Sequence, residues 1–266
     1  MEGYGGKGGN RQDWLNGRSM ASDFTLAGYR ALLNAFTERG YITVRYEDAR
    51  PDRRDLILRH DIDMSLTAAL GMAELEAEMG HSAHYFVLVR SALYNTAAPA
   101  NRRVLLRLRE LGHRVGLHLD ASHYPDDDDA LDAGCAIECA ALKVILGEEP
   151  IPVVSLHRPA PRLQGSPRRI GGRRHTYEPA IFSEIGYCSD SRGDWRHGHP
   201  LEQPAVAAGR ALQLLTHPIW WTREPGESAV ARLDRLRLEL DRQLAEELAA
   251  NCDIYREPAA YTRLAS

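Results

Sequence analysis

The chain has 266 residues, of which 44% are hydrophobic and 26% charged, and its formal net charge is −4. A chain of this size can bury a core that needs no disulfide or metal to stabilise it. The slightly acidic balance provides no overall positive field, so we expect neither a nucleic-acid partner nor attraction to anionic membranes. No stretch approaches the roughly 20 apolar residues of a membrane-spanning helix. Composition carries no prediction of the oligomeric state.

The first 21 residues combine glycine with polar side chains where a signal peptide would carry its apolar core. We interpret residues 1–21 as a disordered tail, because they can bury too little surface to offset the entropy lost on ordering. No later segment has the composition of a linker, so residues 22–266 are interpreted as one domain. Cys135 and Cys139 share one face of an expected helix, which suits core packing better than a disulfide. These features predict a cytoplasmic protein.

Apolar segments with helical spacing alternate along this domain with short apolar runs typical of buried strands. Such alternation indicates parallel strands joined by crossover helices, and we predict a single α/β domain. Ser22-Asp23 has the composition of a helix N-cap, and glycine follows several of the expected helices. In chain order the expected elements are helix 24–39, strand 56–58, helix 66–79, strand 83–89, helix 100–111, strand 114–118, helix 129–146, strands 152–157, 185–188 and 211–216, and helix 226–249.

Histidine and aspartate stand directly after four of the expected strands. In parallel α/β folds the carboxyl ends of the strands meet at one edge, where catalytic residues gather. A single histidine in such a place is usually a hydrogen-bonded structural residue, but four strand ends of this kind indicate a shared site. The four segments are His60-Asp61-Ile62-Asp63, His118-Leu119-Asp120, His157-Arg158-Pro159 and His217-Pro218.

Asp61 and Asp63 lie two residues apart at the end of a strand, so both side chains project to the same face. Two carboxylates that face one cleft repel each other, and a bound cation relieves that repulsion. An imidazole such as His118 suits a divalent ion of the zinc kind, with a coordination position left open for water and substrate. The pattern therefore predicts a metal-dependent hydrolase. His60 is expected to point to the opposite face and to be structural.

The order of these short motifs resembles that of the polysaccharide deacetylase family, carbohydrate esterase family 4. The resemblance covers about residues 24 to 222. It is carried by Leu58-Arg59-His60-Asp61-Ile62-Asp63, Gly112 to Asp120, Ser155-Leu156-His157-Arg158-Pro159, Cys188-Ser189-Asp190-Ser191 with Trp195-Arg196, and Leu214-Leu215-Thr216-His217-Pro218.

This resemblance implies a distorted (β/α)7-type barrel that holds a divalent metal, often zinc, between one aspartate and two histidines. It implies that Asp61 is the general base, that Asp63 and His118 are metal ligands, and that His217 protonates the leaving amine. His157-Arg158 falls where the family has an arginine that orients the base, so both are expected to be catalytic.

The third metal ligand is open, because the sequence departs from the family pattern at this point. The family's second metal-binding histidine follows the first by four residues, and that position is Ser122 here. His123 is one residue later, Asp120 shares the strand face of His118, and His157 is a third possibility. The usual Asp-Asp pair is also replaced by Asp61-Ile62-Asp63, which changes the offset of the two carboxylates.

Four further residues are expected on the substrate side of the site. Asp190, Trp195 and Arg196 follow the strand that ends near Cys188, and an indole can stack on a sugar ring while a guanidinium grips a carboxylate or phosphate. Trp195 could equally anchor its loop in the core. Trp220 could likewise contact the substrate or pack in the core, because one member of the Trp220-Trp221 pair is expected to be a core residue.

Taken together, these features predict a metal-dependent deacetylase that hydrolyses an N-acyl amide, as in an N-acetyl group, on a soluble sugar or small metabolite. Hydrolysis of another C–N bond in a small metabolite is a variant of this interpretation. A binding protein that has lost turnover on the same barrel is the alternative from another class, and the serine at position 122 favours it.

Overall fold

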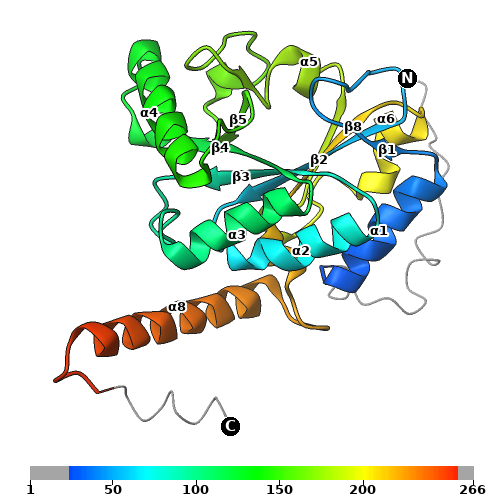
Figure 1. Cartoon of the computed structure of the whole chain (residues 1–266). Coiled ribbons are helices and arrows are strands. Elements are labelled where there is room, and N and C mark those ends of the chain that lie inside the picture. The colour runs from blue at the N-terminus through cyan, green and yellow to red at the C-terminus, as the bar shows by residue number, and fades with distance from the viewer. Residues whose placement is uncertain (1–23, 257–266) are drawn as a thin grey trace, which may run out of the picture.

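The computed structural model describes residues 24–256, so the expected tail and the Ser22-Asp23 cap lie outside the described residues. One sheet of eight strands, paired in parallel throughout, forms the centre of the fold (Figure 1). The strands are β1 (Ile42–Thr43), β2 (Asp55–Ile62), β3 (His84–Leu88), β4 (Arg114–Asp120), β5 (Val153–His157), β6 (Arg174–His175), β7 (Gly186–Ser189) and β8 (Leu212–Thr216).

The strand order is β6-β5-β4-β3-β2-β8-β7, with β1 paired to the start of β2. The sheet curls into a half-barrel, so the predicted α/β domain with a distorted (β/α)7-type barrel is confirmed. In this order β2 lies between two groups: strands β3, β4, β5 and β6 lie to one side of it, and β8 and β7 to the other. The carboxyl ends of β2, β4, β5 and β8, where the expected site residues lie, thereby meet at one edge of the sheet.

Helices cover the outer face of the sheet, and the long α8 extends away from it (Figure 1). Side-chain caps explain several helix ends: the Asp127 carboxylate accepts hydrogen bonds from the backbone N–H groups of Asp129 and Ala130, and Gly147 ends the same helix in a left-handed conformation. The helices are α1 (Leu26–Glu38), α2 (Thr67–Glu78), α3 (Pro99–Glu110), α4 (Asp128–Leu146), α5 (Pro179–Phe182), α6 (Pro204–Ala207), α7 (Pro218–Trp221) and α8 (Ala229–Asn251).

Two apolar clusters pack on the two faces of the sheet. The larger joins the strands to the helices outside, and a smaller one around Ile57, Phe86 and Val153 fills the closed end of the half-barrel. Gly116 makes the inner packing possible, because a Cβ there would lie 2.8 Å from the Phe86 ring and 2.7 Å from Ile151. The polar site therefore lies next to a layer of buried apolar side chains.

Every helix and strand expected from the sequence is present. The largest difference is at β2, which continues to Ile62 instead of ending at Leu58. The strands β1 and β6 and the one-turn helices were not expected, because segments of two to four residues carry no periodicity to detect. Cys135 and Cys139 are buried free thiols of α4, as predicted. Within residues 24–256, no helix is both long and apolar enough to cross a membrane.

Candidate active site

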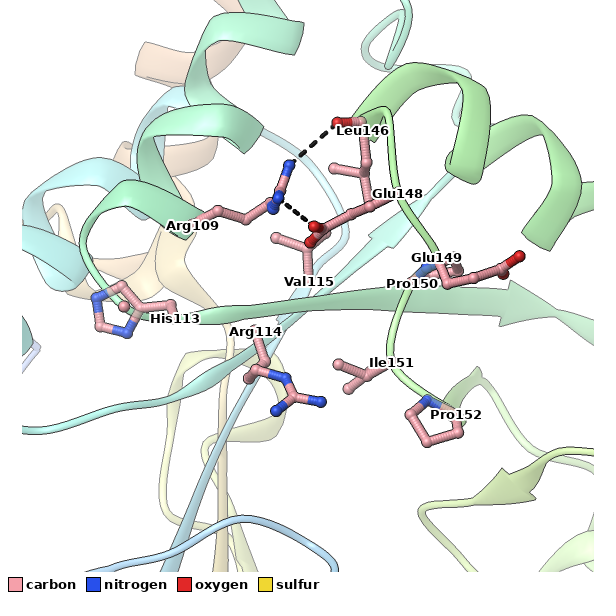
Figure 2. Close-up of a pocket in the computed structure, with 11 residues that line it drawn as sticks. Arg109, His113, Arg114, Val115, Leu146, Glu148, Glu149, Pro150, Ile151 and Pro152 are labelled. Carbon is pink, nitrogen blue, oxygen red and sulfur yellow. Dashed lines mark hydrogen bonds and ion pairs between the residues drawn. The ribbon is translucent and has the colours of Figure 1, made fainter.

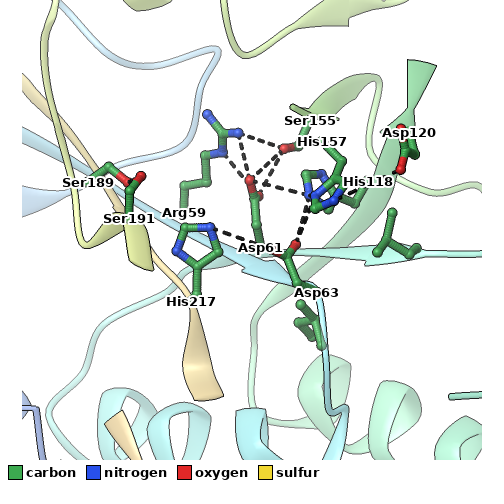
Figure 3. Close-up of polar contacts among 12 residues, drawn as sticks. Arg59, Asp61, Asp63, His118, Asp120, Ser155, His157, Ser189, Ser191 and His217 are labelled. Carbon is green, nitrogen blue, oxygen red and sulfur yellow. Dashed lines mark hydrogen bonds and ion pairs between the residues drawn. The ribbon is translucent and has the colours of Figure 1, made fainter. Parts of the chain in front are cut away.

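A cavity of about 500 Å³ opens at the carboxyl ends of the central strands. Polar side chains from β2, β4, β5 and β8 converge there, as their positions at the strand ends predict (Figure 3). Its lining residues are Asp61, Asp63, Met64, Leu93, His118, Leu156, His157, Arg158, Pro159, Tyr177, Tyr187, Ser191, Arg192, Leu215, His217 and Trp220.

Asp61 is held by a buried clamp. Arg59, two residues earlier on the same face of β2, donates from Nε to Oδ1 at 3.1 Å and from Nη2 to Oδ2 at 2.7 Å. The Ser155 hydroxyl lies 2.9 Å from both carboxylate oxygens. Burial opposes ionisation, but the charge and hydrogen bonds of Arg59, together with the charges of nearby histidines, outweigh it and lower the pKa of Asp61. The carboxylate is therefore ionised and fixed in orientation at the cavity wall.

Asp63, His118 and His157 form a compact group beside Asp61. Oδ1 of Asp63 lies 3.1 Å from Nε2 of His118 and 3.3 Å from Nδ1 of His157, and the two ring nitrogens are 3.2 Å apart. The three side chains come from β2, β4 and β5, and their ligand atoms face one another (Figure 3). An aspartate with two histidines is a ligand set typical of zinc and similar divalent ions.

The dimensions of this group fit a metal ion. Two ligand atoms at 2.0–2.1 Å from a tetrahedral ion lie roughly 3.3 Å apart, close to all three observed separations. Oδ1 of Asp63 is buried and has no hydrogen-bond partner among the described residues, although a buried carboxylate oxygen normally requires one. A cation would satisfy that oxygen, and the residues present therefore suit a divalent ion.

The structure brings His157 into this group, and not His123 or Asp120. The His123 side chain is 37% exposed in the turn after β4, and its Nε2 is 3.9 Å from Asp120. Asp120 accepts hydrogen bonds from the backbone and hydroxyl of Ser122, so it caps that turn. Asp120 also lies 3.9 Å from Nε2 of His157, behind the ligand group. Of the three residues left open for the third ligand, His157, which was also expected among the catalytic residues, is the one that joins Asp63 and His118 in this group.

His217 lies on the other side of Asp61 and Asp63 and is fixed by Asp190. Its Nδ1 is 2.6 Å from Oδ1 of Asp190, and Nε2 faces the cavity, 3.8 Å from Oδ2 of Asp63. The Trp221 indole N–H donates to the other oxygen of Asp190 at 2.8 Å. Burial alone would lower the pKa of His217, but the charge of Asp190 and then those of Asp63 and Asp61 raise it to about 9.

Asp190 therefore differs from its expected place on the substrate side. It is fully buried beneath His217, and it accepts hydrogen bonds from the His217 backbone N–H as well as from the ring. This arrangement fixes which His217 nitrogen faces the cavity and favours the protonated ring. The contact follows from the assembled sheet: Asp190 directly follows β7, β7 pairs with β8, and His217 directly follows β8.

Arg158 does not orient the base. It is exposed at the cavity rim, and Arg59 forms the clamp on Asp61 instead. Strand alternation could have identified Arg59, because it shares the face of Asp61 and Asp63. The Arg59 guanidinium is fully buried and lies over the Tyr177 ring, 5.0 Å from its centroid. This contact helps to fix Arg59 in the orientation in which it binds Asp61.

The other expected substrate contacts divide between cavity and core. Trp220 lines the cavity. Trp195 packs against Phe24 and Trp221 with ring centroids 5.6 and 6.0 Å away, so it anchors its loop. Arg196 is exposed and is not part of the cavity wall.

His60 points to the opposite face of β2, as predicted. Its ring contacts Thr216 and the buried carboxylate of Glu76, which also accepts hydrogen bonds from the hydroxyls of Tyr29 and Tyr85. This network joins the sheet to α1 and α2 and has no contact with the cavity.

A second cavity, of about 600 Å³, lies at the amino ends of β4 and β5, away from this site (Figure 2). Its charged residues already have partners: Arg109 forms an ion pair with Glu148 and donates to the Leu146 carbonyl at 3.0 Å, and Arg114 and Glu149 pair with residues outside the cavity. It holds no convergent group of metal ligands among residues 24–256.

Neither a protein-family model nor a curated protein matches the chain. Among solved structures, a family 4 carbohydrate esterase from Bacillus anthracis matches at 15% identity over 79% of this chain and 86% of that chain, with a TM-score of 0.38. A mutant of the peptidoglycan deacetylase PdaC from Bacillus subtilis matches at 14% identity over 73% and 86%, with a TM-score of 0.42. The deacetylase PplD from Streptococcus pyogenes in complex with acetate matches at 12% over 86% and 92%, with a TM-score of 0.39. The chain is thus similar to family 4 carbohydrate esterases and deacetylases, the family that its motif order resembles.

Proposed function

We propose that this protein is a divalent-metal-dependent deacetylase that hydrolyses an N-acyl amide, such as an N-acetyl group, on a sugar or small metabolite. One observation carries the proposal: the ligand atoms of Asp63, His118 and His157 lie 3.1–3.3 Å apart. Asp61, clamped by Arg59, and His217, paired with Asp190, lie beside this group. The resemblance of the motif order to polysaccharide deacetylases supports the same reaction.

Asp63, His118 and His157 would hold the metal, with zinc the ion that this ligand set favours. A divalent ion at that place supplies charge to polarise the amide carbonyl and to lower the pKa of a nearby water. Asp61 lines the same cavity and is the proposed general base. Arg59 and Ser155 keep its carboxylate ionised and aimed, so it is ready to accept the proton of the attacking water.

His217 is the proposed general acid on the opposite side of the reacting carbon. Collapse of the tetrahedral adduct requires a proton on the departing nitrogen, because an amide anion is a poor leaving group. The charge and hydrogen bond of Asp190 raise the pKa of His217 and so favour its protonated form, and Asp190 directs Nε2 into the cavity. Water attack and departure of the amine are therefore served by different side chains.

The test combines metal analysis with release of acetate. Purified protein is loaded with Zn²⁺, Co²⁺ or Mn²⁺ and assayed by ¹H NMR on a panel of N-acetylated amino sugars, their phosphates and N-acetylated amino acids. Asp61→Asn is expected to retain one metal per chain and lose turnover, whereas Asp63→Ala is expected to lose the metal. Full activity in both variants, or no stoichiometric metal after loading, would overturn the proposal. If the enzyme hydrolyses a cyclic amide but releases no acetate from any N-acetylated compound, its reaction is hydrolysis of another C–N bond.

A further inference from the structure

Two arginines of the cavity have an unusual backbone conformation. Arg158 has φ of 48° and Arg192 has φ of 62°, and among residues 24–256 these are the two non-glycine residues with positive φ. In this region the Cβ atom crowds the following carbonyl oxygen, which glycine avoids. Strained residues of this kind persist where function needs the side chain, and they cluster at binding sites. Here both positions line the candidate active site.

Neither guanidinium has a partner within the described part of the chain. Arg158 and Arg192 are exposed at the cavity and form no ion pair or side-chain hydrogen bond there. Two arginines of the neighbouring loop do form ion pairs: Arg162 pairs with Asp126 and Asp128, and Arg168 pairs with Asp128. Unpaired arginines occur elsewhere on the surface of residues 24–256, and Arg158 and Arg192 differ from them because they line the cavity.

The charges around them leave the two arginines uncompensated. The cavity wall contains two carboxylates: Asp61 is neutralised by its ion pair with Arg59, and Asp63 belongs to the metal-ligand group. The chain as a whole carries a formal charge of −4, so this concentration of positive charge is local. A concave surface of one sign concentrates ligands of the opposite sign.

We propose that Arg158 and Arg192 bind an anionic group of the substrate, so that the substrate class is an acylated amine that carries a phosphate or a carboxylate. Arg158 and Arg192 follow β5 and β7, which are separated in the strand order, and both residues line the same cavity. A guanidinium forms paired hydrogen bonds with the oxygens of either group. This proposal rests on the proposed function, because it names the substrate of that same site.

The test measures binding of three probes that lack an amide: glucose 6-phosphate, glucuronate and glucose. Titration calorimetry is carried out on metal-loaded wild type and on Arg158→Gln, Arg192→Gln and the double variant. Arg196→Gln is the matched control, because Arg196 is an exposed arginine of the same loop as Arg192 and does not line the cavity. Each cavity variant is expected to weaken binding of an anionic probe about tenfold or more, as loss of a hydrogen bond between charged groups does. The control is expected to stay within about twofold.

Preference for glucose 6-phosphate identifies a phosphate ester as the anion, and preference for glucuronate identifies a carboxylate. Equal binding of glucose and the charged probes, or an unchanged affinity in the double variant, would overturn the inference. Metal-dependent hydrolysis that is insensitive to the double variant would refute anion recognition and leave the proposed function standing. Arginine-dependent binding with no hydrolysis of any amide would refute the proposed function alone.

Discussion

Nε2 of His118 and Nδ1 of His157 lie 3.2 Å apart at the ends of the neighbouring strands β4 and β5, and both face Oδ1 of Asp63. His157→Ala is therefore expected to weaken Zn²⁺ binding by more than about 100-fold, because outer partners of metal ligands already contribute 10- to 100-fold. His123→Ala, the control in the turn nearby, should bind the metal as wild type does. Competition with a chromophoric chelator measures both affinities. Loss of binding in His123→Ala alone would contradict this assignment.

Arg59→Met should destabilise the fold by about 3–5 kcal/mol, since it leaves the buried Asp61 carboxylate without its charged partner. Arg107→Met removes an exposed ion pair with Glu110 and is expected to change the free energy of unfolding by less than about 1 kcal/mol. Urea denaturation at neutral pH compares the two variants. A further change of Asp61 to Asn in Arg59→Met should restore part of the loss, because the neutral side chain costs less to bury.

Asp190→Asn is expected to lower kcat by about 10³- to 10⁴-fold, as replacement of the aspartate that orients a catalytic histidine does elsewhere. The substitution removes the main charge that raises the pKa of His217. His217 should then lose its proton at a lower pH, and the alkaline limb of the pH–rate profile should move to lower pH. A purely structural role would lower activity at every pH and leave that limb in place.

The contribution of Glu76 to the free energy of unfolding is expected to depend on pH. Burial opposes its ionisation, but the His60 ring and the Tyr29 hydroxyl hold the pKa of Glu76 below its ordinary value. Because the folded pKa is depressed, the stabilisation is fully present above the ordinary range of a glutamate and is lost as pH falls through the folded pKa. The difference in unfolding free energy between wild type and Glu76→Gln should therefore shrink as the pH is lowered from 7 to 3. A constant difference across this range would contradict the argument.

Arg192→Gly should raise the free energy of unfolding by about 1 kcal/mol, because glycine adopts the left-handed conformation without strain. Differential scanning calorimetry measures the change, with Arg196→Gly, outside the left-handed region, expected to show no gain. A rise in stability together with weaker binding of an anionic probe would mark Arg192 as a residue retained for binding. A fall in stability would indicate that the side chain supports the loop.

The sequence was sufficient to predict the main elements of the fold and most members of the site. Strand alternation correctly placed Asp61 and Asp63 on one face and His60 on the other, because side chains alternate along any strand. The same rule applied to Arg59 would have identified the clamp on Asp61. Arg59 was not predicted, because the family resemblance places the orienting arginine at Arg158.

Two relationships depended on tertiary structure and could not be read from the chain. The choice of His157 over His123 follows from the register of β4 and β5, which pairs Asp120 with His157 and His118 with Ser155. The pairing of Asp190 with His217 follows from the adjacency of β7 and β8. Parallel strands separated by helices leave no local signal of which strand neighbours which, so such contacts emerge only from the assembled sheet.

Because β2 lies between two groups of strands, the site has two parts that come from different sides of the sheet. The chelating side chains lie on β2 and the β4–β5 side, whereas the histidine–aspartate pair lies on the β7–β8 side. Substitutions on the β7–β8 side are therefore expected to affect the proposed proton donor first, and those on the β4–β5 side the proposed metal ligands first. Asp63 on β2 joins the two parts of the site, because it belongs to the group with His118 and His157 and also lies 3.8 Å from Nε2 of His217.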